Sequence, residues 1–229
     1  MSYFPNPAIG GLAEMTEYEN AVLTGFDQTN TYHPVVDAAV SGSTLDGWTY
    51  LGSASGTYTT VANAGGGQIT FGGATGHGMV AGQVVFITSS SVAGYQPPNP
   101  TIFIIQSVTA NTFTVIGTFT TTATGNWSRG CSLTAGAGAA GQYLLFWSVT
   151  VTPAGNNKNF KFEPVQNATN VDKCSAGSIL TTTGPQCMSN QCCLPIAAGD
   201  ILTLAGNNQT DSNDFTLVNM NFQLKRYER

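Results

Sequence analysis

The chain has 229 residues, of which only 8% are charged, and its formal net charge is −5 at pH 7. An ordinary domain is about a quarter charged. Because 41% of the residues are hydrophobic, the composition excludes a charge-rich disordered chain. The seven Lys and Arg residues are scattered, which argues against a nucleic-acid partner, since such binding needs clustered cations. No apolar run is long enough to span a bilayer and no signal peptide opens the chain, so we expect cytoplasmic synthesis and no membrane partner.

Residues 1–16 show no strand periodicity and are punctuated by Pro and Gly, which predicts an extended arm. The alternative is a frayed terminus, in which Tyr3, Phe4 and Ile9 would be exposed without purpose. We therefore predict that these three residues anchor the arm on another protein. Residues 14–20 form the only stretch whose pattern suits a helical turn.

Strand and turn signals fill the rest of the chain, which predicts an all-β protein. Residues 56–126 are richer in Gly and Thr than their flanks, and their short strands at close intervals are typical of a small barrel or sandwich. Insertion of a domain at a surface loop is well tolerated. We therefore predict a sandwich built from residues 17–55 and 127–229 and interrupted by an inserted β domain at residues 56–126.

Two strands near the C-terminus are apolar on one face and partly apolar on the other. In residues 143–151 the alternation places Trp147 on the core face and Phe146 on the second face. In residues 215–224 it places Val218 and Phe222 on one face, and Phe215, Leu217 and Asn219 on the other. A half-apolar second face favours burial against another subunit. The alternative is that a loop or the inserted domain covers it.

The five cysteines include a cluster of four at Cys174, Cys187, Cys192 and Cys193. Their spacing lacks the paired ligands of a zinc site, and the adjacent Cys192 and Cys193 should point to opposite faces of a strand. Small buried hydrophobes are one interpretation. A Cys174–Cys187 disulfide, formed after release into an oxidising exterior, is the other.

No constellation of catalytic residues is visible. His77 lies between two glycines in a turn without a neighbouring nucleophile or carboxylate, so we interpret it as structural rather than catalytic. Asp200 follows Ala-Ala-Gly and is interpreted as a turn residue rather than a calcium ligand. We expect no enzyme activity, no cofactor and no metal.

Three C-terminal segments carry a resemblance. GQYLLFWSVT at residues 141–150, LPIAAGDILTL at residues 194–204 and FTLVNMNFQL at residues 215–224 resemble strands of the tumour-necrosis-factor and complement-globular-head jelly roll. That resemblance implies a trimer-forming jelly-roll β-sandwich whose corresponding strands face the threefold axis, an analogy at the level of the fold. The residues expected at the trimer interface are Phe146, Phe215, Leu217 and Asn219.

A second resemblance lies in the middle of the chain. GHGMVAGQVV at residues 76–85 and VTANTFTV at residues 108–115 are similar to a module of phage tail and fibre proteins. We therefore expect a virion structural protein of a tailed phage, a homotrimeric capsid decoration, cement or head-fibre protein. Its partners would be itself and major capsid or other virion proteins.

A receptor-binding or tail-fibre module that recognises host surface glycans is the alternative. The absence of a long shaft repeat and the short chain favour decoration, whereas the tail-module resemblance favours a fibre tip. A hydrolase is a third hypothesis, and no site in the sequence supports it.

Overall fold

The computed structural model describes residues 12–17, 21–23, 33–34, 47–95, 103–167, 169–181, 183–210 and 215–227. These residues contain strands and three short 3₁₀ turns but no α-helix, so the all-β prediction is confirmed. The turns are η1 (Ala93–Tyr95), η2 (Ala137–Ala139) and η3 (Asp172–Cys174).

Sheet A is antiparallel and has the strand order β1-β19-β13-β17, with β2 also paired to β19. Along β13 buried side chains alternate with half-buried ones, the period of two that a strand with one face on a core requires. The bounds of its strands are β1 (Leu12–Glu17), β2 (Ala21–Leu23), β13 (Gly141–Pro153), β17 (Gln186–Ile196) and β19 (Phe215–Arg226).

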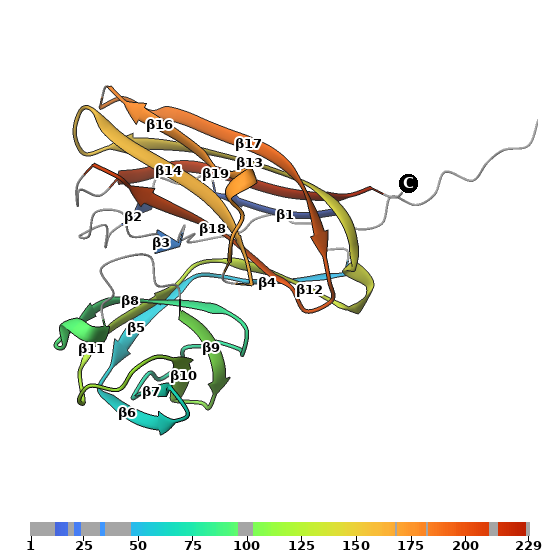
Figure 1. Cartoon of the computed structure of the whole chain (residues 1–229). Helices are drawn as coiled ribbons and strands as arrows, with labels where there is room; N and C mark the ends of the chain where they lie inside the picture. The colour runs from blue at the N-terminus through green and yellow to red at the C-terminus, as the bar shows by residue number, and fades with distance from the viewer. Residues whose placement is uncertain are drawn as a thin grey trace, which may run out of the picture.

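Sheet B has the order β15-β14-β18-β12-β4, with β16 beside β14 and β3 beside β18. Figure 1 shows it stacked on sheet A. Its strands are β3 (His33–Pro34), β4 (Trp48–Leu51), β12 (Ser132–Ala135), β14 (Lys158–Gln166), β15 (Thr169–Asn170), β16 (Ala176–Leu180) and β18 (Ile201–Asn208).

The two sheets share one apolar core. Trp147 of β13 and Phe222 of β19 meet Phe160 and Phe162 of β14 within it. The Phe215 ring packs edge-on against those of Phe160 and Phe162, with centroid distances of 5.0 and 5.4 Å. Sheets A and B are therefore the two layers of a β-sandwich.

The described strands between residues 54 and 129 build a separate small sheet with the order β5-β11-β8-β9-β10-β7-β6, seen below the sandwich in Figure 1. Its own core is aromatic, with the Phe71 and Phe113 rings stacked at 5.0 Å between centroids. The small sheet begins two residues before and ends three residues after the expected limits of 56 and 126. Its strands are β5 (Ala54–Tyr58), β6 (Thr60–Gly65), β7 (Gln68–Gly72), β8 (Val84–Ser90), β9 (Phe103–Val108), β10 (Thr112–Ile116) and β11 (Gly125–Arg129).

Strand β8 joins the small sheet to the sandwich. Its Val85 belongs to the core of the small sheet, whereas Val84 and Phe86 pack against Val165 of β14 and Ala205 of β18. All of these side chains are at least nine-tenths buried. The contact therefore covers part of the face of sheet B that points away from the sandwich core.

Arg129 forms hydrogen bonds at the place where the chain enters and leaves the small sheet. Its Nε donates to the carbonyl of His77 at 3.0 Å, and its Nη1 donates to the carbonyl of Gly52. The side chain is 7% exposed, and burial lowers the pKa of the guanidinium from its usual value. One side chain thus ties the entry at Gly52 and the turn at His77 to the exit strand β11.

We predict that the sandwich folds without the small sheet. Ser132 of β12 lies opposite Leu51 of β4, and paired strands are only about 5 Å apart. A two- to four-residue Gly-Ser linker in place of residues 54–129 should therefore make a β4–β12 hairpin. We expect a cooperative unfolding transition by far-UV circular dichroism, at lower stability because Val165 loses its cover. Loss of the transition would contradict separability.

Residues 12–16, predicted to belong to an N-terminal arm, form part of sheet A. Leu12–Glu17 is strand β1 and pairs antiparallel with β19, so the boundary at residue 16 is wrong, as is the helical turn over its first four residues, 14–17. A single helical turn fixes several residues for few hydrogen bonds, whereas the edge of sheet A offers a complete ladder. The anchoring prediction for Tyr3, Phe4 and Ile9 lies outside the described residues.

Candidate functional site

On the outer face of sheet A, which points away from the sandwich core, uncharged side chains of β19, β13 and β17 lie side by side in two rows across the strands. Gln223 of β19 and Gln191 of β17 both lie opposite Phe146 of β13. The next row contains Asn221, Ser148 and Ser189. Because residues directly opposite in an antiparallel pair share a face, the register brings these six side chains together from three neighbouring strands.

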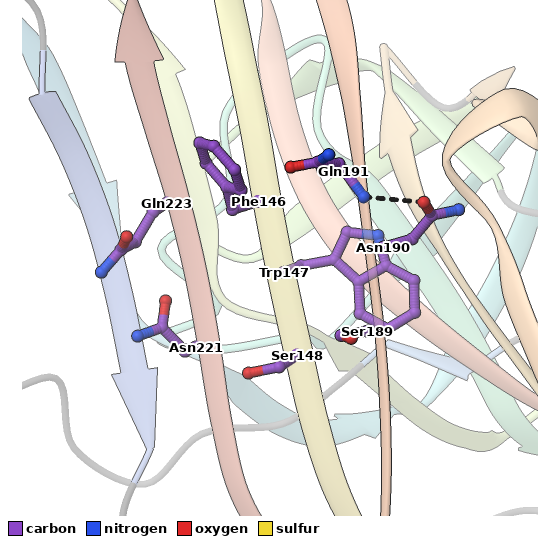
Figure 2. A pocket seen from close by; sticks show the side chains of 8 residues that line it. All are labelled: Phe146, Trp147, Ser148, Ser189, Asn190, Gln191, Asn221 and Gln223. Atoms are coloured by element: carbon purple, nitrogen blue, oxygen red, sulfur yellow. Dashed lines mark hydrogen bonds between the residues drawn. The ribbon is translucent and has the colours of Figure 1, made fainter.

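These rows line a groove of about 480 Å³. Figure 2 shows the Phe146 ring beside Gln223 and Gln191, with Asn221, Ser148 and Ser189 further along the strands. None of the lining side chains is charged at neutral pH, and amides and hydroxyls both donate and accept hydrogen bonds. The groove is therefore equipped for neutral hydrogen bonding and for contact with one aromatic ring.

The other two residues that border the groove point inward and support it from behind. Trp147 is 2% exposed and donates its indole N–H to the carbonyl of Cys174 at 2.8 Å. The amide of Asn190 donates to the carbonyl of Ser175 at 2.6 Å, and its oxygen accepts from the backbone N–H of Gln191, as drawn in Figure 2. Residues 174–175 thus hold β13 and β17 in register.

Two of the four residues predicted at the trimer interface are not on the outer face of sheet A. Phe215 and Leu217 are 1% and 0% exposed and lie in the sandwich core. The register between β13 and β19 shifts, because Thr150 pairs with Asn219 while Val151 pairs with Leu217. This β-bulge inserts one residue and reverses the alternation of faces beyond it.

The remaining two residues of that set are on the outer face. Phe146 lies within the groove and Asn219 lies opposite Thr150, two rows away. Both are half-buried in the single chain. The sequence analysis did not identify Ser189 and Gln191. The alternation along β17 could have indicated them, because Met188, Asn190 and Cys192 take the inward positions between and beside them.

The disulfide prediction named the wrong partner. Cys174 bonds to Cys192, with 5.5 Å between their Cα atoms, within the usual range for disulfides. Cys192 shares the inward parity of Met188 and Leu194, whereas Cys187 points outward and is exposed. The prediction that Cys192 and Cys193 face opposite ways is confirmed, since Cys193 is exposed.

His77 is held as part of a turn. Its Nδ1 accepts from the backbone N–H of Met79 at 2.9 Å, so Nε2 carries the proton that it donates to the carbonyl of Thr109 at 2.8 Å. The ring is 3% exposed. Both nitrogens are therefore occupied in positioning the backbone ahead of β8.

Asp200 closes the turn between β17 and β18. Its N–H donates to the carbonyl of Ala197 at 3.1 Å, and Gly199 has φ 89°, the geometry of a type II turn. The carboxylate accepts from the Ala197 N–H at 2.8 Å and from the amides of Gln166 at 2.8 Å and Asn167 at 2.7 Å. Burial raises the pKa of Asp200, but the three hydrogen bonds outweigh it, so the pKa lies below its usual value.

We expect Asp200→Asn to lower the free energy of unfolding by about 1–2 kcal/mol at neutral pH, because a half-exposed charged acceptor is lost. The pKa of Asp200 is lower in the folded state than in the unfolded state, where it is about 3.9. Its carboxylate therefore stabilises the fold fully at pH values above the unfolded pKa, and this contribution is lost as the pH falls through the folded pKa. Urea unfolding at several pH values should show that the wild type and the variant differ less in their free energy of unfolding as the pH becomes acidic. A difference independent of pH would contradict this role.

Two further findings concern the described residues alone. They contain no group of three or more His, Cys, Asp or Glu side chains arranged to hold a metal ion. Among them there is also no helix of the length and apolar character that crossing a membrane requires.

No family model and no curated protein matches this chain. Solved structures with some likeness include dimeric latent PorU from Porphyromonas gingivalis, 7% identical over 76% of this chain and 24% of that chain, with a TM-score of 0.30. An isomalto-dextranase of Arthrobacter globiformis T6 complexed with panose is 11% identical over 74% and 34%, with a TM-score of 0.22. The insecticidal delta-endotoxin Cry8Ea1 of Bacillus thuringiensis is 9% identical over 95% and 53%, with a TM-score of 0.27. The chain therefore spans about a quarter to a half of these proteins, and scores this low carry no functional assignment.

Proposed function

We propose that this chain is a homotrimeric structural protein of a virus particle, of the capsid decoration, cement or head-fibre kind in a tailed phage. The supporting observation is the groove around Phe146 on the outer face of sheet A, whose lining side chains carry no charge; the charged residues Glu14 and Lys225 lie beside it, opposite Gln223 and Leu144. In a cyclic assembly, groups near the axis meet their own copies, so charged groups there would repel one another. Amides such as Gln191 and Gln223 can instead pair across the contact, because each both donates and accepts.

The strand order supports the jelly-roll part of this proposal. From β12 onward the chain passes repeatedly between the sheets, with β13, β17 and β19 in sheet A and β12, β14, β16 and β18 in sheet B. Strands that alternate between two antiparallel sheets are typical of a jelly roll. The trimer and the virion location enter by resemblance at the level of the fold and of the motifs.

Light scattering tests the assembly. We expect a trimer at micromolar concentration, and we expect Phe146→Asp to yield a folded monomer because it places three like charges around the axis. The matched control is Ile179→Asp, which changes a side chain that is 62% exposed on β16 of sheet B and should leave a trimer. A monomeric wild type would refute the proposal, and a trimeric Phe146→Asp would move the interface elsewhere. Labelled electron microscopy of intact particles tests the location.

Recognition of host surface glycans is a second candidate, and the groove itself favours it. Neutral sugars are bound by amide and hydroxyl groups, with their apolar faces against aromatic rings, and Phe146 is flanked by such groups. Calorimetric titration with maltoheptaose and with an N-acetylglucosamine hexamer tests this function. Binding that Phe146→Ala abolishes while the protein stays monomeric would replace the structural proposal, because one groove cannot serve both partners.

A further inference from the structure

Two thiols of the chain are free and exposed, Cys187 and Cys193 of β17. They cannot bond to each other, because six residues of strand separate their Cα atoms by about 20 Å, whereas a disulfide tolerates at most about 7 Å. Cys131 is buried in the sandwich core at 0% exposure, and the other two cysteines already form the Cys174–Cys192 bond. Any disulfide of Cys187 or Cys193 must therefore join the chain to another molecule.

Both thiols lie on the face that we propose for self-association. Cys193 lies opposite Leu144, one row beyond Phe146, and Cys187 lies opposite Thr150, one row beyond Ser148. The two cysteines thus flank the groove along the edge strand of sheet A.

Symmetry decides which thiols meet. Neighbours in a cyclic trimer contact each other through different patches, so a disulfide between neighbours joins two different residues. A threefold rotation also keeps each atom at its height along the axis, so Cys187 of one copy meets Cys193 of the next only where β17 runs across the axis. Each chain has two neighbours and carries two exposed thiols. We propose that Cys187 of each copy forms a disulfide with Cys193 of the next copy, closing the homotrimer covalently with three bonds. This inference rests on the proposed homotrimer.

The chemistry needs an external oxidant, and oxidised glutathione supplies it. The Cys187 thiolate attacks glutathione disulfide, forms a mixed disulfide and releases one reduced glutathione. The Cys193 thiolate of the neighbouring copy then attacks the Cys187 sulfur and releases a second one. The two cysteine protons end on the two glutathione thiols, and one disulfide is exchanged for another. Such a bond forms after the chain leaves a reducing cytoplasm.

The test begins with reduced protein, whose oligomeric state is first measured by light scattering. Glutathione disulfide is added, free thiols are blocked with N-ethylmaleimide, and the chains are separated by electrophoresis in detergent without reductant. We expect the 23.9 kDa chain to shift to a band of three times that mass and no larger, and the shift to reverse with dithiothreitol. Cys131→Ala should not change this result, because that thiol is buried.

Single variants test the pairing itself. Cys187→Ser and Cys193→Ser should each abolish all covalent linkage while remaining trimers by light scattering. Co-expression of the two variants should restore a band at twice the chain mass, because each mixed trimer then contains one complementary pair. Dimers from either variant alone, glutathione adducts only, or ladders beyond three chains would each overturn the inference. A monomer before the oxidant is added would instead refute the homotrimer.

Discussion

Replacing Trp147 with Ala is expected to lower the free energy of unfolding by about 3–5 kcal/mol. The side chain is 2% exposed and belongs to the core between sheets A and B, so its removal leaves a cavity lined by both sheets. The change also removes the hydrogen bond to the carbonyl of Cys174 at 2.8 Å. Urea unfolding followed by far-UV circular dichroism measures the loss. Fluorescence alone is unsuitable, because Trp48 and Trp127 are buried too.

Trp147→Phe is the matched control. It keeps an aromatic ring in the core but leaves the Cys174 carbonyl without its donor, so we expect a smaller loss of about 1–3 kcal/mol. If Trp147→Ala instead left the stability unchanged and removed binding to a glycan, Trp147 would be a binding platform and not a core residue. The sequence-based assignment of Trp147 to the core is confirmed by its burial.

Leu217→Ala is expected to cost about 2–5 kcal/mol, whereas Val218→Ala should cost about 1 kcal/mol or less. Leu217 is 0% exposed in the sandwich core, and Val218 is the extra, half-buried residue at the bulge in β19. If the alternation of faces continued unbroken along β19, Val218 would be the core residue, and Val218→Ala would cost more stability than Leu217→Ala. Urea unfolding of the two variants therefore tests the bulge directly, and a larger loss for Val218→Ala would contradict it.

The bulge also changes what the outer face of sheet A offers to another molecule. Without Phe215 and Leu217, the apolar part of that face around the groove is Phe146 with Leu144 of the adjacent row. Phe146 lies among amides and hydroxyls, whereas Leu144 lies between Cys193 and Lys225. An interface on this face would therefore be rich in hydrogen bonds and in ordered water, as many specific interfaces are. This composition makes Phe146 the position where a single substitution is most informative.

Local pattern was sufficient wherever a strand runs regularly. The alternation from Tyr143 to Val151 determined which side chains of β13 enter the core, because successive residues of a strand face opposite sides whatever else surrounds it. The composition of residues 56–126 indicated a separate set of strands, and 54–129 form the small sheet. The turn at Asp200 also followed from its local sequence.

Tertiary structure decided the features that depend on a partner strand. A bulge exists only relative to the neighbouring strand, so the position of Leu217 could not be predicted from β19 alone. The bond between Cys174 and Cys192 depends on η3 lying beneath β17, and the groove depends on the register of β19, β13 and β17. The all-β class, the faces of regular strands and the local turns could therefore be predicted, because they depend on neighbours along the chain. The disulfide, the bulge and the groove required the folded chain, because each is a contact between residues distant in sequence.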